Sequence, residues 1–175
     1  MVDLTGVVKG DASNYNENEL YFDTTSVKKV VWLSLLTFGV YEIIWFYKTW
    51  KTLAVRFGYK VSPFWRAIFG TITGFWLFPI IADYVKKFNV ESFNGIVFAI
   101  LYLIITLLYR LPNQLWLICM ASVVIIAIVQ DKINKVNAQH FPNAQVNKWS
   151  GINTFWAILG GIITFFAVIG SFIPE

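Results

Sequence analysis

The sequence predicts an all-α integral membrane protein, and three observations support this fold class. First, 57% of the 175 residues are hydrophobic and only 14% are charged, whereas an ordinary soluble domain is about one quarter charged. Second, a soluble chain of this length has too little interior to bury so much apolar surface. Third, most of the apolar residues lie in five segments that polar stretches separate. Lipid is therefore the expected solvent for much of the chain.

Residues 1–26 differ in composition from the rest of the chain. They hold five acidic residues against one lysine and show no sustained apolar period. We predict a polar, acidic N-terminal tail here, and a helical membrane domain over residues 27–175. The expected anchors of the end of this tail, on the protein or on the membrane surface, are Tyr15, Tyr21 and Phe22.

The first two apolar segments, residues 30–47 and 67–82, contain residues that interrupt a simple span. The sequence Thr37-Phe38-Gly39 is expected to break the first segment into two short helices. Three helix-weakening residues are expected to break the second: Gly70, Gly74 and Pro79. Both segments are therefore candidates for re-entrant or interfacial helices.

The last three apolar segments, residues 93–109, 111–130 and 149–174, are predicted to be transmembrane helices. A helix needs about 20 apolar residues to cross the roughly 30 Å hydrocarbon core. The last two meet this length, and the first of the three is slightly short but unbroken. Only the sequence RLPN links residues 93–109 to residues 111–130, so these two helices should form an antiparallel hairpin.

The basic residues indicate how the segments are oriented. Loops rich in lysine and arginine stay on the cytoplasmic side, which predicts that the N-terminus and residues 48–66, 84–92 and 131–148 are cytoplasmic. Arg110 and the C-terminus then lie outside. If the first two segments both crossed, the most basic loop, residues 48–66, would face the outside. We therefore favour two re-entrant or interfacial segments, with five transmembrane helices as the alternative.

Glu42 is the one acidic residue inside the first apolar segment. A charge at the bilayer centre costs at least about 2.5 kcal/mol on insertion scales, so Glu42 should have a partner or lie near water. Arg66 and Asp83 bracket the second segment and are the candidate partners. For this polar cluster, a structural bridge between the two segments and a proton or substrate site are both open interpretations.

Aromatic side chains crowd into the same region of the sequence. Tryptophan and tyrosine collect at the headgroup level of a bilayer, where their polar edge stays hydrated. We therefore predict an aromatic shelf at the membrane surface. Its members are Tyr41, Trp45, Tyr47, Trp50 and Trp65.

The sequence contains no recognisable catalytic or cofactor-binding motif. His140 is the only histidine and Cys119 the only cysteine, which is too few for a metal site of the usual kind. His140 is expected to be an ordinary loop residue. The net charge of +4 is spread over loops and forms no basic stripe, which argues against nucleic-acid binding. We expect a non-enzymatic protein without a metal or cofactor.

The stretch SVKKVVWLSLLTFGVYEIIWFYKTWKTL, followed by VSPFWRAIFG, resembles a family of uncharacterised bacterial integral membrane proteins. That family repeats the pattern S-x-x-K-x-x-x-L-x-x-x-T-x-G-x-Y-x-x-x-W-x-Y-x-x-W and then P-F-W-R-A-x-F. The matching positions are Ser26, Lys29, Leu33, Thr37, Gly39, Tyr41, Trp45, Tyr47, Trp50, Pro63, Phe64, Trp65, Arg66, Ala67 and Phe69. The match covers residues 26–70, and the remainder is similar only in being apolar. The resemblance implies a bacterial inner-membrane protein without an assigned activity, in which the motif positions form one unit.

These features predict an accessory or scaffold subunit of a membrane complex, or a membrane-organising factor. The expected partners are the lipid bilayer with its anionic headgroups, a membrane protein, or a second copy of the chain. The alternative function is a transport or channel component with a site near Glu42, Arg66 and Asp83.

Overall fold

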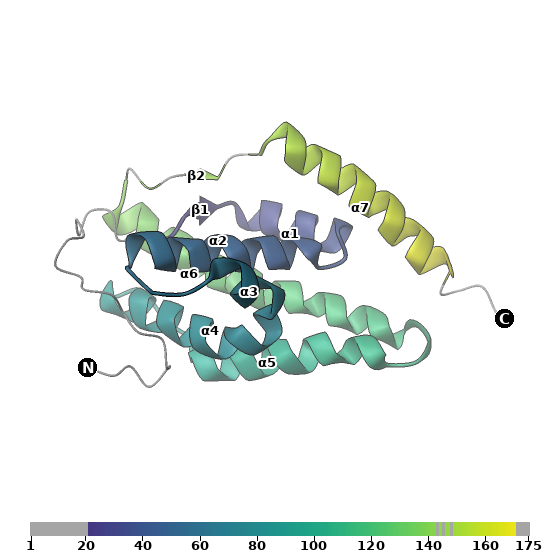
Figure 1. The fold of residues 1–175 in the computed structure, drawn as a ribbon, viewed down its shortest axis with the longest axis horizontal. Helices are drawn as coiled ribbons and strands as arrows, with labels where there is room; N and C mark the ends of the chain where they lie inside the picture. Colours follow the sequence, from purple (N-terminus) through teal and green to yellow (C-terminus); the bar gives the residue numbers. More distant parts are fainter. Residues whose placement is uncertain (1–20, 143, 145, 148, 171–175) are drawn as a thin grey trace.

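The computed structural model describes residues 21–142, 144, 146–147 and 149–170. Apart from one pair of two-residue strands, the described elements are helices (Figure 1), which confirms the predicted all-α class. In chain order the elements are β1 (Thr24–Thr25), α1 (Val27–Leu36), α2 (Val40–Arg56), α3 (Pro63–Ile68), α4 (Gly70–Lys87), α5 (Gly95–Leu107), η3 (Leu108–Arg110), η4 (Asn113–Ala121), α6 (Ser122–His140), β2 (Val146–Asn147) and α7 (Gly151–Gly170).

α1 and α2 form a hairpin, because the helix stops at the predicted break. Phe38 and Gly39 adopt positive φ angles of 56° and 81°, and the Gly39 amide donates to the Ser34 carbonyl at 2.8 Å. Glycine enters this left-handed conformation at a helix end without the steric cost of a Cβ. The Thr37 hydroxyl then links the two helices, since it accepts a hydrogen bond from the Tyr41 amide at 3.0 Å.

α3 and α4 also form a bent unit, but the break lies at Phe69. Gly70 begins α4, and this helix is continuous through Gly74 and Pro79, so the predicted breaks at these two residues are wrong. Proline inside a helix removes one backbone hydrogen bond, but α4 runs on past Pro79 to Lys87. α5 lies so close to this turn that a Cβ added at Gly95 would be 2.5 Å from the Pro79 Cα.

The antiparallel hairpin predicted for the third and fourth segments is confirmed. α5 begins after Asn94, whose side chain accepts hydrogen bonds from the amides of Ile96 and Val97. After η3, Leu111 is extended, with a ψ angle of 143°, as expected for a residue that precedes proline. η4 and α6 then run back beside α5 (Figure 1).

One helix of the described chain is long and apolar enough to cross a membrane, by length and composition alone. It is the 24-residue stretch Leu117–His140. The other two predicted spans correspond to shorter apolar helices, Gly95–Arg110 and Asn153–Phe166. The prediction of three helices of transmembrane length is therefore correct for one of them only. The third segment falls short because the Asn94 cap and the turn at residues 111 and 112 limit it.

Residues 21–25, which the sequence analysis assigned to the tail, belong to the folded body. The Phe22 side chain is buried, and the Phe22 backbone carbonyl accepts a hydrogen bond from the Asn137 side-chain amide at 2.6 Å. Arg56 donates to the Tyr21 carbonyl and to the Asp23 carboxylate, both at 2.9 Å, and β1 pairs with β2 in parallel. The expected anchoring by Tyr21 and Phe22 is thus confirmed on the protein itself. Residues 1–20 of the predicted tail lie outside the described residues.

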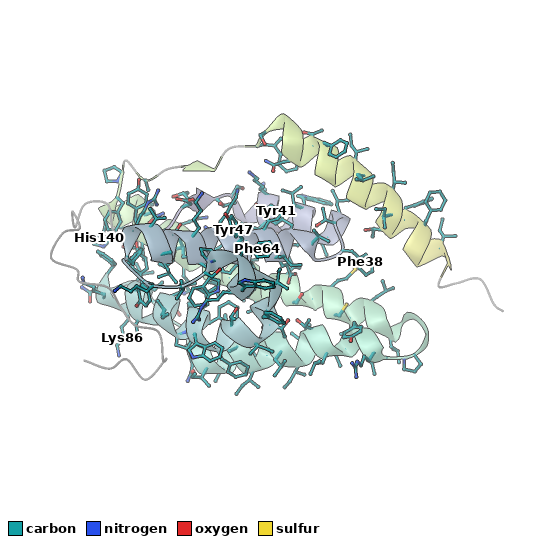
Figure 2. The ribbon with its side chains drawn as sticks, viewed as in Figure 1. Phe38, Tyr41, Tyr47, Phe64, Lys86 and His140 are labelled. Carbon is teal, nitrogen blue, oxygen red and sulfur yellow. The ribbon has the colours of Figure 1, made fainter. Side chains whose placement is uncertain are left out.

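α2, α4 and α6 finish at one end of the molecule (Figure 1), and the last turns of α2 and α4 carry the basic residues Arg56, Lys86 and Lys87. Figure 2 shows Lys86 and His140 at this end and Phe38 toward the other. Here Lys132 of α6 donates to the Glu91 carboxylate at 2.8 Å. His140, which we expected in a loop, is the last residue of α6.

The contact between Glu91 and Lys132 predicts a small pH dependence of stability. The hydrogen bond from Lys132 lowers the pKa of the exposed Glu91 carboxyl below its ordinary value. Since the folded-state pKa lies below the unfolded one, the contact stabilises the fold above the unfolded pKa, and this stabilisation is lost as pH falls through the folded pKa. We expect the midpoint of thermal unfolding to drop more between about pH 6 and pH 3 in the wild type than in Lys132→Gln. Equal drops in the two proteins would contradict the prediction.

Candidate functional site

Glu42 lies in the first turn of α2, and its side chain is only 6% exposed. A carboxylate in this position is stabilised by the helix dipole and by the unpaired amides of the first turn. Two hydroxyl groups bond to it. Tyr102 of α5 donates at 2.7 Å, and Ser122 at the start of α6 donates at 2.9 Å. Three helices that are distant in the sequence therefore meet at one carboxylate.

The structure separates Glu42 from the two partners that the sequence predicted. The Arg66 guanidinium carbon lies 4.6 Å from the centroid of the Trp50 ring and 5.8 Å from that of Trp76. Asp83 is exposed on α4. Among the described residues, no lysine or arginine forms an ion pair with Glu42. The predicted polar cluster is therefore wrong. Cation–π contacts hold Arg66 on Trp50 and Trp76, and the Glu42 carboxylate accepts hydrogen bonds from hydroxyl groups instead.

Glu42 lines a cavity of about 470 Å³. The cavity lies where the turn of the α1–α2 hairpin meets the α3–α4 bend, against α5 and the junction of η4 with α6. Most of its walls are apolar, and they include Phe38, Ile43, Phe46 and Met120. The cavity thus surrounds a carboxylate with hydrocarbon and aromatic groups.

Ser34 is a second polar group in the same cavity. Its side chain is 1% exposed, and its hydroxyl has no hydrogen-bond partner among the described residues. Such buried hydroxyls are uncommon, since leaving one unbonded costs about 1–3 kcal/mol. The cavity therefore contains a bonded carboxylate and, at Ser34, a buried hydroxyl without a hydrogen-bond partner among the described residues.

The predicted aromatic shelf divides into two groups. Three of its members are buried in the core: Tyr41, Trp45 and Trp50. Two are exposed: Tyr47 and Trp65. The prediction of a membrane-surface position is therefore wrong for the first group. The polar edge of Trp45 is satisfied inside the protein, where its indole nitrogen donates to Gln130 at 2.7 Å, so it needs no hydrated headgroup region.

Three residues of the site were missed by sequence reasoning: Ser34, Tyr102 and Ser122. Tyr102 offered a usable signal, because a tyrosine in the middle of an apolar helix needs a partner for its hydroxyl. The serines offered none, since a serine in a helix can bond to its own backbone. Charged residues in the sequence therefore indicate Glu42 but not its hydrogen-bond partners.

The chemistry available at this site is limited to what these side chains can do. Within the described residues, no group of three or more His, Cys, Asp or Glu side chains is placed to hold a metal ion. Cys119 lines the cavity as a free thiol. The Glu42 carboxylate, supported by two hydroxyl donors, is able to bind a proton or a small cation.

Comparison of the chain with protein-family models, with curated proteins and with solved structures finds no match. The resemblance of residues 26–70 to bacterial integral membrane proteins therefore stays a prediction. Within this stretch, Thr37 and Gly39 lie in the turn between α1 and α2, and Arg66 stacks on Trp50.

Proposed function

We propose that this protein is a small, non-enzymatic integral membrane protein. The observation that carries the proposal is the apolar outer surface of three helices, α5, η4–α6 and α7. Large hydrophobic side chains are exposed on all of them: Ile96, Val97, Ile100, Leu101, Ile104, Leu107, Leu115, Ile118, Val124, Ile128, Phe155, Ile158, Leu159, Ile162, Ile163, Phe165, Phe166 and Ile169. An apolar surface of this extent is typical of contact with lipid or with other proteins, and the charged side chains at one end of the molecule are placed for a headgroup region.

In the proposed topology, α5, the helix Leu117–His140 and α7 cross the bilayer. The α1–α2 hairpin and the α3–α4 unit enter from the charged end and return to it. In each unit the turn lies farther from this end of the molecule than the two ends of the unit do (Figure 1), which supports a re-entrant arrangement, and protein on their inner sides covers their backbones. The helix Gly95–Arg110 is about 24 Å long, which a locally thinned bilayer accommodates at modest cost.

The same topology places the charged end in the cytoplasm of a bacterial cell, with the C-terminus outside. Exposed lysines at this end, among them Lys60, Lys86 and Lys87, are suited to anionic lipid headgroups. Each basic residue near such a surface contributes about 1 kcal/mol to membrane attraction. The five-helix arrangement stays the alternative, and it would place Lys60 outside.

Cysteine labelling distinguishes these two topologies. In a Cys119→Ser background, a cysteine replacing Lys60 should resist a membrane-impermeant maleimide in sealed cells and react after lysis. Arg110→Cys is the matched control, because Arg110 is also exposed and lies outside in both arrangements, so it should react in sealed cells. Labelling at position 60 before lysis would overturn the re-entrant topology.

We further propose that the protein is an accessory or scaffold subunit, with α7 as the surface for a partner. α7 packs chiefly against α1, through Gly160 and through the Thr164 hydroxyl, which donates to the Leu36 carbonyl at 3.0 Å. Large side chains elsewhere on this helix are exposed, among them Ile158, Ile162 and Phe166, and a helix held on one side only has faces free for a neighbouring transmembrane helix.

A pair of matched variants tests the role of α7. Ile162 on α7 and Ile104 on α5 are both 51% exposed. If α7 binds a partner, Ile162→Trp should dissociate a stoichiometric complex solubilised from the native membrane, whereas Ile104→Trp should leave it intact. Isolation of the wild-type chain alone, with lipid only, would contradict the subunit role.

A transport component is the second candidate function, and the Glu42 cavity is the observation that favours it. A buried carboxylate between the α1–α2 turn and the α3–α4 bend is suited to a proton or cation site, since intramembrane acids commonly mark transport paths. The tests are proton flux into proteoliposomes and its loss in Glu42→Gln, with Glu91→Gln as control. Absence of flux through the wild type would remove this candidate.

A further inference from the structure

The Glu42 site is electrostatically incomplete within the described part of the chain. Its carboxylate is buried and accepts hydrogen bonds from Tyr102 and Ser122, but both donors are neutral hydroxyl groups. A buried carboxylate without a cation is costly unless a proton or a positively charged partner balances it. The cavity beside it leaves room for such a partner.

The unbonded Ser34 hydroxyl indicates which kind of charged group would balance the Glu42 carboxylate. Ser34 and Glu42 line the same cavity from the two helices of one hairpin. A hydroxyl accepts hydrogen bonds as well as donating them, so one group with several N–H donors can bond to both side chains. A primary ammonium has three such donors and the required charge.

The remaining walls specify the rest of the ligand. Phe38, Ile43 and Phe46 present hydrocarbon and aromatic surface to the cavity, which favours an apolar chain over a hydrated metal ion. We propose that this cavity binds a primary alkylammonium ion, with the nitrogen on Glu42 and Ser34 and the alkyl chain against these walls. The proposal holds whether the protein is an accessory subunit or a transport component.

Calorimetry on the full chain in lipid nanodiscs tests the proposal, with n-butylammonium chloride as the probe. We expect saturable binding with one site per chain. n-Butanol, which has the same chain without the charge, should bind at least about tenfold more weakly, and so should tetramethylammonium, which has the charge without N–H donors. Equal affinity for butanol would overturn the proposal in favour of a purely apolar cavity. Equal affinity for tetramethylammonium would overturn the role of the N–H donors.

Three variants locate the binding contacts. Glu42→Gln should weaken n-butylammonium binding at least about tenfold, and Ser34→Ala about threefold to tenfold. Glu91→Gln should leave it unchanged, since this acid is exposed outside the cavity. Unchanged binding in Glu42→Gln would overturn the proposal, and unchanged binding in Ser34→Ala would overturn the role of the serine. Absence of saturable binding to the wild type would overturn the proposal.

A measurement on the wild-type chain keeps the test independent of variant folding. Cys119 is the only cysteine of the sequence and lines this cavity. Saturating n-butylammonium should slow its reaction with methyl methanethiosulfonate about fivefold or more if the ligand fills the cavity, whereas n-butanol should not. Equal reaction rates with and without n-butylammonium would contradict occupancy of the cavity.

Discussion

Trp50→Ala is expected to lower the free energy of unfolding by about 4 kcal/mol, the typical cost of removing a buried tryptophan. The Trp50 side chain is completely buried, and the Arg66 guanidinium carbon lies 4.6 Å from the centroid of its ring. The substitution would therefore leave a large cavity and remove a cation–π contact. SDS titration of the purified protein in mixed micelles, with helicity measured by circular dichroism, provides the free energy.

Trp65→Ala is the matched control for this substitution. Trp65 belongs to the same predicted shelf, but its side chain is 60% exposed, so the expected change is about 0.5 kcal/mol or less. Trp50→Phe should lie between the two, because it keeps most of the ring volume. The indole N–H that it removes has no partner among the described residues. Similar losses for Trp50→Ala and Trp65→Ala would contradict the division of the shelf into core and surface residues.

Gly95→Ala is expected to lower the free energy of unfolding by about 3 kcal/mol, through overpacking. A Cβ at this position would lie 2.5 Å from the Pro79 Cα and 2.7 Å from the Phe78 carbonyl carbon. These are backbone atoms of α4, and they cannot move aside as the end of a side chain can. α5 must therefore shift away from α4, which would disturb the crossing that accommodates Pro79. Thermal unfolding in detergent should show a midpoint lower by about 10 °C.

Gly151→Ala is the control for the effect of alanine itself. A Cβ at Gly151 would have no neighbour within 4 Å, and alanine favours the helical conformation over glycine. We expect an unchanged or slightly raised midpoint. A midpoint for Gly95→Ala equal to that of the wild type would show that α4 and α5 do not approach as closely as the structure describes.

Much of the helical layout was predictable because its signals are local. The break at Gly39 follows from a glycine at a helix end, and the turn before Pro112 follows from the restriction that proline places on its neighbour. Pro79 misled the prediction, since α4 continues through it in a region where α5 packs closely at Gly95. The close approach at Gly95 was missed, because nothing local distinguishes Gly95 from other glycines.

The aromatic residues show the same limit. Trp45, Trp50 and Trp65 look alike in the sequence, and composition assigned all three to a membrane surface. Only the position of each on its helix, and what the neighbouring helices cover, decides between core and surface. The hydrogen bond from Trp45 to Gln130 joins residues 85 positions apart, and no local pattern indicates it.

The sequence by itself determined the class of the protein: a helical chain with five apolar segments and with most of its basic residues in the loops between them. These properties depend on composition and on neighbouring residues, so they can be read without a structure. Only the tertiary structure decided the site. Glu42 bonds to residues 60 and 80 positions away, while Arg66, the predicted partner, stacks on Trp50. The partner of a buried charge depends on which helices meet around it, and local sequence does not contain that information.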